Sequence, residues 1–287
     1  MQFDSVDHFL KSGRAVLAQG PIALLFAEDD VELDSTLQHH LKLGFKSVIF
    51  FMPDDFVLAQ DLPANVHRVT LSCAPRQVVF DTINKVIKAA PGVWMYYGYN
   101  AEYLFYPFCE TRNTLELLAF HSEERRDAMM VHVVDLYADD LARHPNGVAV
   151  DHAMLDRIGY YAHARHTASG EALERQLDMS GGLRWRFEDH IPYARRRIDR
   201  IALFKARKGL ELQPDHTFNI AEYNTYSCPW HHNLTAAVCS FRAAKALKSN
   251  AGSTFDIQSF QWRGSTPFEW NSHQLMELGL MEPGQWF

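Results

Sequence analysis

Acidic side chains directly follow two apolar runs near the start of the chain, 22–26 and 48–52. The acids after the first run are Glu28, Asp29 and Asp30, and those after the second run are Asp54 and Asp55. Carboxylates accept hydrogen bonds from the base and ribose of a nucleotide, and they bind hard cations such as Mg²⁺. Both groups of acids are therefore candidates for ligand binding.

The segment between the two apolar runs has the pattern of an amphipathic helix. It carries leucines at positions 33, 37 and 41 and ends at Gly44, which predicts a helix between two strands. Ligands of open α/β sheets bind outside the carboxyl ends of the strands, which is where the acids lie. A structural explanation stays open, because acids in a first helical turn complement the helix dipole and Pro-Asp sequences form turns.

Strands and helices continue to alternate along the chain. The patterns predict strands over 67–71, 93–99 and 129–137, and helices over 75–90, 114–126 and 233–246. This alternation predicts an α/β protein with a mostly parallel sheet and helices on both faces, followed by an α-rich C-terminal extension.

The bulk composition is that of an ordinary globular protein, with 47% hydrophobic and 22% charged residues. The net charge of −7 argues against general nucleic-acid binding, which requires a basic face. Four cysteines stand far apart, no secretory leader is visible, and no apolar stretch approaches the length of a transmembrane segment. We expect a cytoplasmic protein without a transmembrane segment. Contact with the inner face of a membrane stays open.

Several segments resemble a subgroup of bacterial family-2-like glycosyltransferases. They include AEDDVELDSTLQHHLKLGFKSVIFF, DLYADD, GGLRWRFEDHIP, RIDRIALFKARKGLELQPDHTF and YNTYSCPWHHNLTAAVCSFRAAKAL. The resemblance implies a GT-A fold with a Rossmann-like sheet, a nucleotide-sugar donor and a divalent metal, Mn²⁺ or Mg²⁺. It implies one domain over 1–287, with a nucleotide-binding half, 1–137, and an acceptor-side and C-terminal helical part, 138–287. The donor-binding residues implied are Glu28, Asp29, Asp54, Asp55 and Arg184.

The metal-binding element of that family is degenerate in this chain. Where the family shows Asp-x-Asp-Glu-Phe, the chain reads Tyr99, Asn100, Ala101, Glu102 and Tyr103. Glu102 is the remaining acid, and the resemblance makes it a metal ligand together with His216 and His232. A structural role for the histidines, such as a hydrogen bond inside an aromatic cluster, stays open. Either Asp135, Asp139 and Asp140 compensate for the lost acids, or Asp139 and Asp140 cap a helix that begins near Leu141.

Glu188 and Asp189 follow the segment GGLRWRF. Inverting glycosyl transfer requires a carboxylate as general base on the acceptor hydroxyl, and these two acids are the candidates for that role. A turn followed by an acidic helix start is the structural alternative. The expected function is glycosyl transfer, with inversion, from a nucleotide sugar to an unknown glycan or small-molecule acceptor. The alternative is a catalytically inactive descendant that binds a nucleotide or a glycan.

Overall fold

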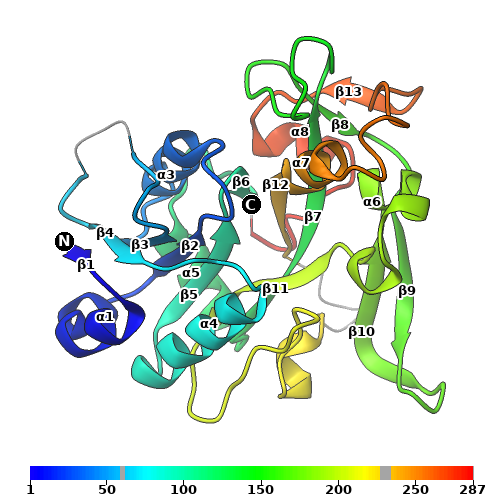
Figure 1. Ribbon diagram of the computed structural model, residues 1–287. Helices are drawn as coiled ribbons and strands as arrows, with labels where there is room; N and C mark the ends of the chain where they lie inside the picture. Colours follow the sequence, from blue (N-terminus) through cyan, green and yellow to red (C-terminus); the bar gives the residue numbers. More distant parts are fainter. Residues whose placement is uncertain (59–61, 227–233, 287) are drawn as a thin grey trace. The chain divides into compact units, whose positions relative to one another are not determined.

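The computed structural model describes residues 1–58, 62–226 and 234–286 (Figure 1). The chain divides into two compact units, each assembled from separate segments. Unit 1 comprises Met1–Tyr103, Cys109–Met130 and Ile201–Asn224, and unit 2 comprises Leu104–Phe108, Val131–Arg200 and Thr225–Phe287. The chain therefore returns to unit 1 long after position 137, where the two parts expected from the sequence meet.

Unit 1 is built on a mostly parallel sheet. Its parallel strands, in spatial order, are β1 (Gln2–Phe3), β4 (Val66–Thr70), β3 (Ser47–Met52), β2 (Ile22–Phe26) and β5 (Trp94–Tyr99). On the far side of β5, residues 203–205 of β11 (Asp199–Lys205) pair antiparallel with it. The predicted α/β class with a mostly parallel sheet is confirmed.

Helices connect these strands on both faces of the sheet. They are α1 (Val6–Ser12), α2 (Arg14–Leu17), α3 (Leu33–Lys42) and α4 (Gln77–Ala89), and a further helix of unit 1, α5 (Thr114–Glu123), follows later in the chain. The connection through α3 steps from β2 to β3, whereas the connection through α4 crosses back from β4 to β5. Right-handed crossovers in opposite directions place α3 and α4 on opposite faces, as Figure 1 shows. The strand order therefore reverses between β2 and β5.

The core of unit 1 explains why its strands read as continuous apolar runs. Every residue of β2 and β3 is buried, because helices cover both faces of the sheet. The buried stripe of α4 includes Val79, Ile83 and Val86. Burying each such side chain contributes roughly 1.5–3 kcal/mol, which is the main term that holds helices and sheet together.

Unit 2 contains shorter strands and helices. Residues 131–138 of β7 (Ala128–Ala138) pair in parallel with β12 (Ala236–Ser240) and antiparallel with β8 (Ala153–Asp156), which pairs with β13 (Ser265–Pro267). The strands β9 (Tyr161–His166) and β10 (Ala172–Ser180) form a separate antiparallel hairpin. The helices are α6 (Gly182–Arg186), α7 (Arg242–Ser249) and α8 (Ser272–Glu277), with short 3₁₀ turns at Glu188–His190 and Tyr193–Arg195.

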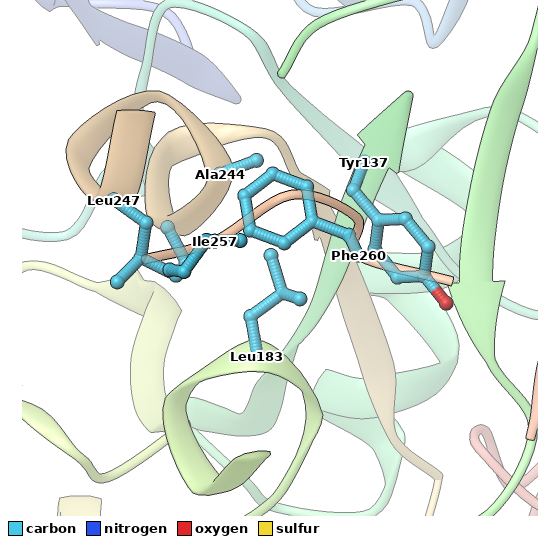
Figure 2. Close-up of a cluster of buried hydrophobic side chains, with 7 residues drawn as sticks. Tyr137, Leu183, Ala244, Leu247, Ile257 and Phe260 are labelled. Atoms are coloured by element: carbon cyan, nitrogen blue, oxygen red, sulfur yellow. The ribbon is translucent and has the colours of Figure 1, made fainter. Parts of the chain in front are cut away.

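An apolar cluster forms a core within unit 2 (Figure 2). Phe260 and Leu183 meet the residues of α7 there, and Tyr137 of β7 closes the cluster on one side. The small side chains of Ala243 and Ala244 allow α7 to pack closely. Protein cores are close-packed, so a substitution that changes the volume of one of these side chains by a single methylene should affect stability.

The prediction of a helix over 233–246 is wrong for the first half of that segment. Residues Ala236–Ser240 form β12, and α7 begins only at Arg242. Every residue of β12 is buried, as expected for a strand in a parallel pair covered on both faces. The alanines of this segment have high helix propensity and led to the prediction of a helix. Tertiary burial overrides this local propensity. The described C-terminal part therefore contains both strands and helices.

Among the described residues, no helix has both the length and the apolar character needed to cross a membrane.

Candidate functional site

The strand order of unit 1 defines where a ligand is expected. Phe26 at the end of β2 pairs with Tyr99 at the end of β5, so the two strands end side by side. The order of strands reverses between them, and open α/β sheets bind ligands in the crevice outside such a switch point. The segments that leave this edge are 27–32, which contains Glu28, Asp29 and Asp30, and 100–102, which contains Glu102.

Asn100 joins the ends of β2 and β5. Its side-chain oxygen accepts a hydrogen bond from the Glu28 amide at 2.9 Å, and its side-chain nitrogen donates to the Val31 carbonyl at 2.8 Å and to the Asp29 carboxylate. The backbone N–H of Asn100 also donates a hydrogen bond to the Phe26 carbonyl, at 3.0 Å. The side chain is fully buried, so these bonds form away from water and fix the acidic segment against the sheet.

Sequence reasoning missed this role of Asn100, which it read only as a departure from an acidic element. An amide both donates and accepts, whereas a carboxylate at this position would only accept. The Asp29 carboxylate and the Val31 carbonyl each accept a hydrogen bond, whereas the Glu28 backbone N–H donates one. An amide side chain, which both donates and accepts, satisfies all three groups. An asparagine directly after a buried strand was the signal available in the sequence.

Glu102 is turned into the protein at the same edge. Ala101 adopts a left-handed conformation with φ of 57°, and its amide donates to the Thr36 hydroxyl at 2.8 Å. The following carboxylate accepts a hydrogen bond from the Tyr99 amide at 3.0 Å, and Glu102 is fully buried. Glu102 therefore closes a tight turn at the end of β5. This arrangement differs from that of a ligand presented to a metal ion.

The ring of His216 is held between two polar partners. Its Nδ1 lies 2.8 Å from the Tyr97 hydroxyl, and its Nε2 contacts the Arg76 guanidinium. Arginine only donates, so we assign Nε2 as the acceptor and Nδ1 as the protonated nitrogen. Arg76 also lies over the Phe80 ring, 5.4 Å from its centroid. The lone pair that a metal would need is thus directed at Arg76.

The described residues do not fit the divalent metal that the resemblance implies. No group of three or more His, Cys, Asp or Glu side chains in the described part of the chain is arranged to hold an ion. Glu102 and His216 have the other bonds given above. His232 lies outside the described residues. The metal stays a prediction.

Asp54 and Asp55 are exposed after β3. The Asp54 carboxylate accepts a hydrogen bond from the Thr70 hydroxyl at 2.6 Å, and the Asp54 carbonyl accepts one from Arg68 at 2.9 Å. These bonds link the ends of the neighbouring strands β3 and β4. A structural role for Asp54 is thus visible, and a ligand contact stays a prediction.

The remaining candidates belong to unit 2. Arg184 donates to the Arg197 carbonyl at 3.0 Å and forms an ion pair with the buried Asp135, with 3.5 Å between Nε and Oδ1. Glu188 accepts a hydrogen bond from Arg196 at 2.8 Å, whereas the neighbouring Asp189 is exposed. Arg184 is therefore engaged inside unit 2. Glu188 and Asp189 lie in a short turn at the surface of that unit.

No family model matches the chain, and no curated protein matches it.

Proposed function

We propose that the protein is a glycosyltransferase that moves a sugar from a nucleotide-sugar donor to a glycan or small-molecule acceptor in the cytoplasm. The observation that carries this proposal is the acidic segment 27–32, which Asn100 fixes at the β2–β5 switch point. A parallel sheet with this strand order binds nucleotides at that place in many unrelated proteins, so the fold supports the location more strongly than it supports the chemistry.

In the proposed donor site, carboxylates accept hydrogen bonds from the nucleoside. Glu28 is exposed at the edge, and Asp29 is oriented by its bonds from Asn100 and from the Val31 amide, the latter at 3.1 Å. Ribose hydroxyls and base N–H groups are donors that match such carboxylates. Negative charge then develops on the leaving diphosphate and requires cationic partners. Arg76, which precedes α4 and is oriented by His216, is the side chain of unit 1 that we assign to this role.

Transfer with inversion requires one base. The acceptor oxygen attacks the anomeric carbon while the bond to the diphosphate breaks, and a carboxylate takes the proton of the acceptor hydroxyl. Glu188 is paired with Arg196, so we favour Asp189 as the base. The products are the glycosylated acceptor and a nucleoside diphosphate, and no covalent enzyme intermediate forms.

Calorimetric titration of the full chain with nucleotide sugars tests the donor site, first alone and then with Mn²⁺. UDP-glucose, GDP-mannose and their nucleoside diphosphates are suitable probes. The double variant Glu28→Gln, Asp29→Asn should weaken binding by roughly tenfold, because each charged hydrogen bond contributes about 1.5–3 kcal/mol and the amides keep part of it. Glu123→Gln, an exposed substitution at the end of α5, is the matched control and should bind normally. Absence of binding for all probes would reject the proposal.

One observation favours the alternative, a descendant that binds a nucleotide or glycan without turnover. At the position where the family carries metal-binding acids, the Asn100 and Glu102 side chains form hydrogen bonds with the backbone of the protein. An assay for released nucleoside diphosphate separates the two functions. Donor binding with release that depends on Asp189 supports transfer, whereas binding without release across many acceptors supports the alternative.

A further inference from the structure

Apolar side chains from three segments of unit 2 form a continuous surface. The ring centroids of Tyr161 and Trp185 are 5.3 Å apart, and those of Trp185 and Trp262 are 6.3 Å apart. A Cβ atom on Gly264 would lie 2.6 Å from the Trp262 ring and 2.8 Å from the Ile158 side chain, so both side chains reach this glycine. Ile158, Tyr161 and Trp185 are 48%, 44% and 36% exposed. Three of the five large hydrophobic residues exposed in the described part of unit 2 thus lie together.

This surface is held in place from inside the protein. The indole N–H of Trp262 donates to the buried Asp156 carboxylate at 2.7 Å, and Arg186 donates to the same carboxylate at 2.7 and 3.2 Å. The Arg186 guanidinium also lies over the Trp262 ring, 5.1 Å from its centroid. A Cβ atom on Gly159 would lie 3.1 Å from the Trp185 ring and 3.6 Å from the Trp262 ring, so the backbone packs against both rings. Side chains held in this way lose little conformational entropy when a partner covers them.

Two exposed arginines flank the apolar side chains. Arg157 directly precedes Ile158, and Arg263 directly follows Trp262. The Arg157 backbone N–H donates to the Gly264 carbonyl at 2.9 Å, which holds the two segments side by side. We call this set the arginine–aromatic patch; its residues are Arg157, Ile158, Tyr161, Trp185, Trp262 and Arg263.

The charges of Arg157 and Arg263 are not neutralised within the protein. Neither guanidinium forms an ion pair with a residue that the structure describes. Several other arginines of unit 2 do pair with carboxylates, namely Arg143, Arg165, Arg186, Arg196 and Arg197. The two arginines of the patch therefore remain available to an external anion, and this charge complementarity identifies the kind of partner.

We propose that the arginine–aromatic patch binds the surface of a membrane that contains anionic lipids. The Trp185 and Tyr161 rings and the Ile158 side chain enter the headgroup region, and Arg157 and Arg263 pair with lipid phosphates. The contact is peripheral and reversible, and it does not depend on the donor site proposed in unit 1.

The composition of the patch matches the interface between water and lipid. Tryptophan and tyrosine are enriched at that interface, because their rings combine an apolar body with a polar edge. Anionic headgroups attract arginines near the surface, and stable attachment requires such attraction together with apolar contact. Ile158 supplies an aliphatic contact of the kind that acyl chains accept. The patch therefore contains both of the contributions that a peripheral membrane contact needs.

A single-stranded nucleic acid matches the patch less well. Binding of that kind requires cationic groups that follow the phosphate backbone over several nucleotides, with bases stacked on aromatic faces. The patch has only two arginines, and the aliphatic Ile158 cannot stack as a ring does. The chain as a whole carries a net charge of −7, so regions outside the patch repel a long polyanion.

Sedimentation of the full chain with lipid vesicles tests the inference. One set of vesicles contains equal parts of phosphatidylglycerol and phosphatidylcholine, and the other contains phosphatidylcholine alone. We expect binding to the anionic vesicles, weaker binding to the neutral ones, and loss of the difference at high ionic strength, where salt screens the arginines. Trp185→Ala should weaken binding to the anionic vesicles about tenfold, because apolar contact area is lost. Arg157→Ala and Arg263→Ala should each weaken it about fivefold.

Three further variants separate the patch from general effects. Arg157→Lys keeps the positive charge and should bind about as well as wild type. Phe255→Ala is the control for Trp185→Ala, because Phe255 is 79% exposed in the same unit but outside the patch. Arg14→Ala is the control for the arginine variants, because Arg14 is exposed in α2 and has no ion pair with a described residue. Both controls should bind like wild type, and all variants should unfold at the midpoint of wild type.

Several outcomes would overturn the inference. They are absence of binding to the anionic vesicles, equal binding to both kinds of vesicle, and equal affinity of wild type and the three alanine variants of the patch. Equal weakening by Phe255→Ala or Arg14→Ala would overturn it too. A labelled oligothymidine that binds through Arg157 and Trp185, without vesicle binding, would assign the patch to nucleic acid instead. Donor binding is measured with nucleotide sugars and depends on Glu28 and Asp29, so it can persist when membrane binding fails, and the reverse also holds.

Discussion

The Asn100 side chain fixes the edge of the sheet in unit 1, because it satisfies three groups of the segment 27–32. Asn100→Ala leaves these groups without their partner in a buried place. We expect a loss of about 3 kcal/mol in the free energy of unfolding, measured by urea denaturation. Asn113→Ala removes an exposed helix cap and should cost only about 1 kcal/mol. Equal losses in the two variants would show that the bonds of Asn100 are unimportant.

Buried histidines make the stability of the protein depend on pH. Burial lowers the pKa of His121 to about 4, although its ring nitrogen lies 2.9 Å from the Ala128 carbonyl, which opposes the shift. Below the unfolded-state pKa of about 6.5, the unfolded chain binds a proton that the folded protein does not. Lowering the pH from 7 to 5 therefore favours unfolding, by about 2 kcal/mol for this residue.

The substitution His121→Gln removes this proton-binding group. The variant should lose about 2 kcal/mol less stability than wild type between pH 7 and pH 5, measured by urea denaturation. Comparison at pH 8 gives the cost of the substitution alone, because the histidine contributes no linkage above its unfolded-state pKa. Parallel stability profiles for the two proteins would contradict the assignment.

The short helix α6 depends on the absence of a side chain at its first residue. Gly182 has φ of 60°, and a Cβ atom there would also meet the Asp135 carboxylate at 2.9 Å. Gly170, in the turn of the β9–β10 hairpin, has φ of 86° but open space around it. We expect about 1 kcal/mol of destabilisation for Gly170→Ala and about 2–4 kcal/mol for Gly182→Ala, by urea denaturation. Equal losses would mean that the contact with Asp135 imposes no constraint.

At the level of elements, the sequence predicts best where pattern and burial agree. The runs that form β2 and β3 and the stripe of α4 are long and regular, so their type and approximate bounds are confirmed. The strand β12 was missed because its alanines favour a helix locally, and its burial depends on β7, about a hundred residues away. Sequence periodicity contains no information about such a partner.

The candidate site shows the same limit. The strand-end position of Glu28 and Asp29 follows from the alternation of strands and helices. The Glu102 side chain points inward because Ala101 adopts a left-handed conformation. The residue types of that segment do not predict this conformation. Gly181 lies against the Tyr160 ring and Gly182 against the Asp135 carboxylate, so three separate segments of unit 2 meet at these two glycines. Contacts of this kind arise from tertiary packing and could not be read from spacing.

For the whole molecule, the way the chain is divided has consequences for its stability. Unit 1 is completed by residues 201–224, which supply the strand β11 beside β5. The Leu212 backbone exchanges two hydrogen bonds with the Asn84 side chain, at 2.7 and 3.0 Å, and the Phe204 and Phe218 rings pack with centroids 4.7 Å apart. A fragment that ends before this segment lacks one edge of its sheet and part of its core.

We therefore predict that the fragment 1–137 does not fold stably. It should show weak near-ultraviolet circular dichroism and no cooperative unfolding transition, because the side of β5 that β11 covers is left without its partner. A matched protein joins 1–130 to 201–224 through a Gly/Ser linker of about 15 residues, long enough to act as a flexible coil. That protein should regain a cooperative transition in urea. If 1–137 alone unfolds cooperatively at the same midpoint as the linked protein, then residues 201–224 are not needed for unit 1, and the division of the chain at position 137 is the better description.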